Sequence, residues 1–199
     1  MDSDERLKFE FDETFSSLQE SRKKLNSAML RLLVLLVTLT LITLGSPSND
    51  KIEIPFIGLN LSKWSSVHAL SVIAHLLLYS LFSMHCYCQL LKSKLNVLAK
   101  ESGFDSGVPW NVGYPTAFEF VRLNAKLNSN FLPFLYILLL IASILGPFVC
   151  LTYSWCSNGF SSGWLVSLIC CLILAVASGV AIQGTGVDEP RIAELDNAE

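Results

Sequence analysis

The sequence predicts an all-α polytopic membrane protein with four transmembrane helices and helical extensions on the cytoplasmic side. Hydrophobic residues make up 52% of the 199 residues, and charged residues only 16%. The apolar residues are gathered into four long runs, each close to the roughly 20 residues that a helix needs to cross a bilayer. Because these runs lack the alternation of an outer-membrane barrel strand, we interpret them as helices.

The four runs divide the chain into nine segments. In chain order these are a cytoplasmic amphipathic helix (1–24), a first span (25–45), a short outer segment (46–65), a second span (66–91), a cytoplasmic helical hairpin (92–130), a third span (131–155), an outer loop (156–163), a fourth span (164–183) and a cytoplasmic tail (184–199). An even number of spans places both termini on the same side of the membrane.

The basic residues indicate which side that is. Of the fourteen Lys and Arg residues, twelve belong to the side that carries the termini, and only Lys51 and Lys63 belong to the other. Since positively charged residues accumulate on the cytoplasmic side, both termini are predicted to be cytoplasmic.

Residues 1–24 carry an apolar stripe at helical spacing. Leu7, Phe11, Phe15 and Leu18 recur at intervals of three or four, with acids and bases on the opposite face. The pattern favours packing of this stripe on the chain's own cytoplasmic helices, with docking to a protein partner as the second alternative. Lying on the membrane is the least favoured, because seven acids precede Ser21 and anionic lipids would repel them.

The first span contains one arginine near its start. Only 14 residues separate Arg31 from Gly45, or about 21 Å of helix, which is less than the thickness of the hydrocarbon core. Arg31 must therefore extend its side chain to the inner interface or face other helices. The first alternative is favoured because it costs less free energy.

The segments that connect the spans are predicted to be short extended pieces on the outer side of the membrane and helices on the cytoplasmic side. Alternation over 51–54 and 59–61 predicts two extended pieces around a turn, followed by Ser62 as a helix cap. On the cytoplasmic side a second helix is predicted to begin near Pro115 and to present Phe118 and Val121, which we add to the candidate partner-binding residues.

Small residues recur every four positions in the last two spans. The rows include Ala142 and Gly146 in the third span and Gly163, Ser167, Cys171, Ala175 and Gly179 in the fourth. Such rows let membrane helices approach closely, and packing of the two spans on each other is favoured over packing between subunits. The Gly146-Pro147 pair predicts a kink in the third span.

The four spans contain few side chains that could serve in catalysis, ion transport or metal binding. No Asp, Glu or Lys lies inside them, which argues against proton pumps and many ion-coupled transporters. His75 and His85 are the candidate sensing residues, although a neutral His75 bonded to Ser71 or to a neighbouring helix is the favoured interpretation. The stretch His85-Cys86-Tyr87-Cys88 lacks the spacing of a zinc site. No metal, cofactor or catalytic residue is predicted, and we expect no enzymatic activity.

Three features together resemble a known family. The short charged amphipathic lead, the outer segment "IEIPFIGLNLS" running into a His-containing second span, and the four-span plan are similar to small bacterial inner-membrane proteins. Among these, the layout resembles the membrane subunit of the Kiwa anti-phage defence system. The resemblance implies a homo-oligomeric sensor of phage attack that holds a cytoplasmic DNA-binding partner protein, so that no direct nucleic-acid binding is expected of this chain.

The expected function is therefore sensing or scaffolding. Short outer loops, absent transport chemistry and apolar cytoplasmic helix faces predict a protein that relays a membrane disturbance to a cytoplasmic protein. Its expected partners are the lipid bilayer, further copies of itself and that protein. The alternative is a subunit of a small channel or transporter, since a pore lined by backbone and hydroxyl groups is compatible with the spans.

Overall fold

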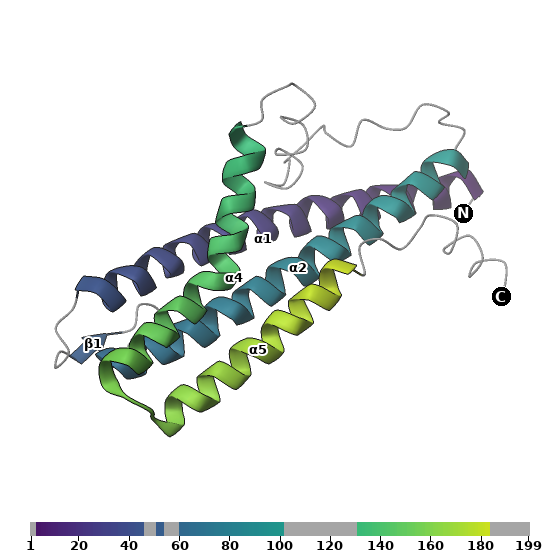
Figure 1. Cartoon of the computed structure of the whole chain (residues 1–199). Helices are drawn as coiled ribbons and strands as arrows, with labels where there is room; N and C mark the ends of the chain where they lie inside the picture. Colours follow the sequence, from purple (N-terminus) through teal and green to yellow (C-terminus); the bar gives the residue numbers. More distant parts are fainter. Residues whose placement is uncertain (1–2, 46–50, 54–59, 102–130, 184–199) are drawn as a thin grey trace.

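The computed structural model describes residues 3–45, 51–53, 60–101 and 131–183, which form four long helices and two short strands (Figure 1). In chain order these are α1 (Ser3–Gly45), β1 (Lys51–Glu53), β2 (Asn60–Ser62), α2 (Lys63–Glu101), α4 (Phe131–Asn158) and α5 (Ser162–Gln183). The predicted all-helical fold is confirmed, and all four helices are long and apolar enough to cross a membrane.

Helices α1 and α2 are much longer than a single membrane span. They contain 43 and 39 residues, or about 64 and 58 Å of helix at 1.5 Å per residue. Neither contains a proline, and neither has a glycine before Gly45 at the end of α1, so nothing in the sequence interrupts them. The two helices run side by side in opposite directions (Figure 1), and the amphipathic N-terminal helix continues into the first apolar run as expected.

The two strands close one end of the structure. Strands β1 and β2 pair antiparallel with Ile52 opposite Leu61, which confirms the two predicted extended pieces. Ser62 caps α2, since its Oγ accepts a hydrogen bond from the backbone N–H of Ser65 at 3.3 Å. We call this end of the bundle the strand end, and the opposite end, where α1 begins and α2 finishes, the N-terminal end.

A leucine-rich seam holds α1 against α2. Leu25, Leu32 and Leu39 of α1 are buried in one cluster with apolar residues of α2 that include Leu70 and Leu78. The outward faces are also apolar, and they expose many large side chains, among them Leu33, Val37, Leu41, Val149, Val176 and Val180. A surface of this kind is typical of a protein surrounded by lipid or by further protein.

Helices α4 and α5 pack differently from the prediction. Helix α4 bends near Pro147, and its first half turns away from α1 and α2 (Figure 1), because proline lacks the N–H of a helical hydrogen bond and its ring crowds the preceding turn. Helix α5 packs mainly on α2 rather than on α4. The small-residue rows of α4 and α5 therefore do not pack on each other along their length.

The members of the two rows have different surroundings. Ala142, Gly163 and Gly179 are exposed, Gly146 and Ala175 are half-buried, and Ser167 and Cys171 are buried. A Cβ added to Gly163 would lie 3.7 Å from Nδ1 of His68 on α2, whereas one added to Gly146 or Gly179 would meet no atom within 4 Å. The row on α5 thus permits close packing, but its partner is α2.

Candidate functional site

A row of polar side chains on α2 faces α4. His68, Ser71 and His75 lie at helical positions i, i+3 and i+7, which places them on one face. His68 Nε2 lies 2.9 Å from the hydroxyl oxygen of Ser154 on α4. The Ser71 hydroxyl donates a long hydrogen bond of 3.5 Å to the backbone oxygen of Pro147. We call these three α2 residues the polar ladder.

His75 is a fully buried member of the ladder. Its side chain is 0% exposed, and its Nδ1 lies 3.1 Å from the backbone oxygen of Ser71. Because a carbonyl oxygen only accepts, Nδ1 carries the proton and donates it to Ser71. The ring meets Phe148 edge-on, with the centroids 4.8 Å apart. The predicted bond of His75 to Ser71 is thus present, through the backbone.

The ladder meets α4 where that helix bends. Since Pro147 has no N–H, this turn of α4 has one helical hydrogen bond fewer than its neighbours. Ser71 bonds the oxygen of Pro147 itself, and His75 packs against the next residue. The half of α4 nearer the strand end is thereby attached to α2, while the other half diverges.

His85, the second candidate sensing residue, belongs to a different part of α2. It lies ten residues beyond His75, or about 15 Å along the helix, so the two cannot form one site. His85 is half-buried, and its Nε2 lies 3.4 Å from Nε2 of Gln89. Among the described residues, no three His, Cys, Asp or Glu side chains lie close enough together to hold a metal ion.

The apolar stripe of the N-terminal helix packs against α2. Leu18 is fully buried in a cluster with Cys88, Leu91 and Leu95, and Phe11 and Phe15 pack on this cluster. Leu7 is half-buried. The stripe thus packs on the chain's own helices, which the sequence favours over docking. The other two candidate partner-binding residues, Phe118 and Val121, lie outside the described residues.

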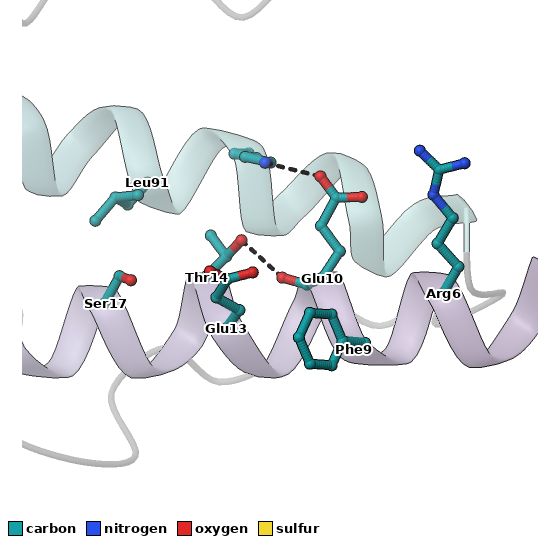
Figure 2. Close-up of a pocket in the computed structure, with 8 residues that line it drawn as sticks. Arg6, Phe9, Glu10, Glu13, Thr14, Ser17 and Leu91 are labelled. Carbon is teal, nitrogen blue, oxygen red and sulfur yellow. Dashed lines mark hydrogen bonds and ion pairs between the residues drawn. The ribbon is translucent and has the colours of Figure 1, made fainter. Parts of the chain in front are cut away.

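A shallow groove runs beside this helix pair (Figure 2). Its lining residues come from both helices and are Arg6, Phe9, Glu10, Glu13, Thr14, Ser17, Leu91 and Lys94. The Glu10 carboxylate accepts a 2.8 Å contact from Nζ of Lys94, and the hydrogen bond and charge of Lys94 lower the pKa of Glu10. Phe9 is 64% exposed, which leaves one aromatic ring available beside paired charges.

Arg22 is a residue whose place the sequence reasoning missed. It is one of the twelve basic residues predicted on the cytoplasmic side, and its side chain is only 1% exposed. Burial lowers the pKa of the Arg22 guanidinium. The missed signal is its spacing: Arg22 follows Leu18 by four residues and precedes Leu25 by three, so it lies on the packed face.

Aromatic side chains gather at the strand end. The Trp155 and Trp164 centroids are 5.2 Å apart, and Phe160 lies 5.8 Å from Trp164. The Trp164 indole N–H donates to the backbone oxygen of Leu151 at 2.9 Å, which ties α5 to α4 near their turn. Trp64 of α2 and Tyr153 of α4 form a further pair at this end.

No protein-family model, curated protein or solved structure matches the chain. The resemblance to the Kiwa membrane subunit stays a prediction from size and layout. What the protein does must therefore be inferred from the polar ladder, the helix pair of the N-terminal end and the apolar outer surface.

Proposed function

We propose that the chain is a non-enzymatic integral membrane protein of four spans that relays a disturbance of the bilayer to a cytoplasmic protein partner. The distribution of polarity supports the membrane setting. Buried polar side chains lie between the helices, among them Ser66, Ser71, His75, Ser143, Ser154 and Ser178, while large apolar side chains face outward. A water-soluble bundle turns charged and polar side chains outward, so this apolar outer surface suits a hydrocarbon environment.

The two ends of the bundle support an orientation. Aromatic residues gather at the strand end, and Lys92 and Lys94 of α2 lie toward the other end. From Trp64 to Lys92 is 28 residues, or about 42 Å, which matches a bilayer of about 40–45 Å with its headgroups. In the orientation that the sequence predicts, the strand end then lies outside and the N-terminal end in the cytoplasm.

The continuity of α1 and α2 carries the proposal. Both helices pass from the apolar part of the bundle into the charged N-terminal end without a break. Because side chains in a packed seam interdigitate, a tilt or rotation of the two spans moves the cytoplasmic helix pair with them. Helix α4, attached near its bend by the polar ladder, supplies an element that can change its angle to this pair.

The resemblance supplies the biological setting of the proposal. If the chain acts as a Kiwa-like membrane subunit, the disturbance is phage attack on a bacterial inner membrane, and several copies of the chain hold the effector protein. The exposed apolar faces of α4 and α5 offer surface for such copies as well as for lipid.

A test of the relay compares bilayers of different thickness. A fluorescent side chain in place of exposed Phe9 reports on the helix pair, and the full chain is reconstituted in phosphatidylcholine with short or long acyl chains. We expect the emission wavelength to shift with the thickness of the bilayer, because hydrophobic mismatch tilts the spans. The variant Ala28→Pro, which interrupts α1 between span and helix pair, should abolish the shift.

Asp4→Pro is the matched control, because proline is tolerated in the first turn of a helix. It should leave the emission shift intact. An emission that is the same in thin and thick bilayers, in a chain that resists carbonate extraction, would contradict the relay without contradicting membrane insertion.

A channel or transporter subunit is the second candidate. The buried histidine and hydroxyl groups of the polar ladder favour it, because a pore needs polar groups between its helices. Conductance in a planar bilayer that changes in His75→Ala would support this alternative. A thickness-dependent emission without conductance would support the relay.

A further inference from the structure

Arg31 of α1 lies on the outward apolar surface of the bundle. It is exposed, and so are its neighbours Leu30, Leu33 and Val34. Within the described part of the chain, the Arg31 guanidinium makes no ion pair and no hydrogen bond. The cation is therefore presented to whatever surrounds α1.

The packing of α1 on α2 gives the depth of Arg31. The two helices run in opposite directions (Figure 1), and Leu18 of α1 is buried in one cluster with Leu91 and Leu95 of α2. Arg31 follows Leu18 by thirteen residues. Because both helices rise by the same distance per residue, Arg31 lies at about the level of Ser80 of α2.

This level is close to the middle of the bilayer. In the proposed orientation α2 crosses the membrane between Trp64 and Lys92, and Ser80 lies about 3 Å from the midpoint of this stretch. Roughly 12 Å of hydrocarbon then separates the Arg31 backbone from the inner headgroups, which is more than the length of an arginine side chain. Of the two alternatives that the sequence leaves for Arg31, extension to the inner interface is not compatible with this depth. The helices that Arg31 faces must belong to another chain.

The surface beside Arg31 has the spacing of a helix seam. Exposed apolar residues recur along α1 at intervals of four and three, and we call them the outer stripe: Leu30, Val34, Val37, Leu41 and Leu44. This is the heptad pattern with which one helix packs along another, and Arg31 occupies the flanking position where charged pairs between helices form. Lipid could cover the outer stripe alone, but a cation at this depth requires an anion beside it.

The composition of the spans indicates where that anion comes from. The four apolar runs of the sequence contain no Asp or Glu. A second copy of the chain would therefore offer only neutral acceptors at this depth, and it would bring a second Arg31. A carboxylate on a spanning helix of a different protein neutralises the cation, and a planar guanidinium binds it with two parallel hydrogen bonds.

We propose that the outer stripe and Arg31 form a docking surface for a spanning helix of a different membrane protein, and that this helix carries Asp or Glu near its middle. The inference rests on the membrane placement in the proposed function. The outer stripe supplies the contact area, and the ion pair selects the partner, because an unpaired charge in hydrocarbon is costly. A partner docked here contacts α1 within the bilayer, where a tilt of α1 also moves the cytoplasmic helix pair.

The test uses designed spanning peptides of leucine and alanine that carry Glu at the middle, Gln at the middle or Glu at one end. The full chain, labelled with a fluorescent donor, is reconstituted with each acceptor-labelled peptide in phosphatidylcholine vesicles, and energy transfer measures binding. We expect the peptide with the central Glu to bind about tenfold more tightly than the other two. Arg31→Gln should remove this preference, and Arg31→Lys should retain part of it.

Two further comparisons separate recognition from damage to the fold. In Arg31→Glu the preference should transfer to a peptide with a central Lys, which a misfolded chain would not show. Val37→Trp obstructs the outer stripe and should weaken binding of the peptide with the central Glu. Val176→Trp, at an exposed position of α5, is the matched control and should leave binding unchanged.

Three outcomes would overturn the docking surface. They are equal binding of the peptides with central Glu and central Gln, an equal loss of binding in Val37→Trp and Val176→Trp, and self-association of the chain that falls in Arg31→Gln. The last would assign Arg31 to a contact between copies. Carbonate extraction separates the two proposals: release of the parent chain from the membrane contradicts both, whereas retention with equal binding of the peptides contradicts the docking surface alone.

Discussion

The two faces of α2 that meet α1 and α4 are built from different chemistry. Against α1 the contact is a leucine-rich seam that continues beyond the apolar run into the cluster around Leu18 and Leu95. Against α4 the contact includes the polar ladder, with its hydrogen bonds to Ser154 and Pro147. The first contact extends over most of α2, and the polar one is confined to a few turns.

The difference has mechanical consequences. Apolar packing is non-directional, and its strength grows with the area in contact, so the α1–α2 pair moves as one body. Hydrogen bonds weaken steeply with distance and angle, and therefore a small change in the bend of α4 weakens the hydrogen bonds of the ladder more than it weakens the apolar seam. The structure thus combines a rigid pair with a neighbouring helix that has a specific attachment, which is what a relay requires.

The largest predicted effect concerns the seam in the cytoplasmic helix pair. Leu95→Ala removes a fully buried side chain from the cluster around Leu18, so we expect a loss of about 3 kcal/mol in the local opening free energy of the pair. Hydrogen exchange of the amides of residues 5–20 measures this loss. Val97→Ala, at an exposed position, should change it by about 0.5 kcal/mol or less. Equal effects of the two variants would show that the seam does not hold the pair.

A smaller effect is predicted for the ladder at His75. His75→Ala should cost about 2 kcal/mol in the free energy of unfolding in detergent, because it leaves a cavity beside Phe148. His75→Phe keeps a ring there and should recover most of that stability, since the Ser71 carbonyl can keep its helical hydrogen bond. If the polar atoms of the imidazole matter for the relay, His75→Phe folds but loses the thickness-dependent emission. If His75→Phe keeps the thickness-dependent emission, the role of His75 is limited to packing against Phe148.

The hydrogen bond between His68 and Ser154 gives a still smaller prediction. A double-mutant cycle with His68→Ala and Ser154→Ala should yield a coupling of about 0.6 kcal/mol, the average for hydrogen bonds between membrane helices. A cycle that pairs His68→Ala with Thr152→Ala is the control, because Thr152 bonds only its own helix. A coupling of zero in the first cycle would mean that α4 is attached by its apolar contacts alone.

The sequence predicts the helices of this fold better than their partners. Long apolar runs, the absence of glycine and proline from α1 and α2 until their ends, and the Ser62 cap are local signals, and the elements that they predict are present. The choice of α2 rather than α4 as the partner of α5 depends on the bend at Pro147, whose direction no local pattern encodes. The partner of the ladder is likewise not predictable from local sequence. Helical spacing places His68, Ser71 and His75 on one face, but it does not determine which helix that face contacts.

The smallest prediction compares two ion pairs in the cytoplasmic helix pair. Glu10 and Lys94 join α1 to α2 with side chains 40% and 52% exposed, so after screening by solvent their contribution is about 0.5 kcal/mol. Lys94 lowers the pKa of Glu10 from its ordinary value of 4.5. The stabilisation is therefore present above pH 4.5 and is lost as the pH falls through the lower pKa of the folded state.

Hydrogen exchange of the helix pair at decreasing pH, corrected for intrinsic exchange rates, should show this loss in the parent chain and not in Lys94→Gln. The Glu20–Lys24 pair lies within α1 alone, and so Lys24→Gln should leave the pH dependence of helix separation unchanged. If both variants remove it equally, the pH dependence reflects the net charge of α1. If only Lys94→Gln removes the pH dependence, the ion pair between Glu10 and Lys94 reinforces the packing of α1 on α2. It does so at the N-terminal end of the bundle, which α4 and α5 do not cover (Figure 1).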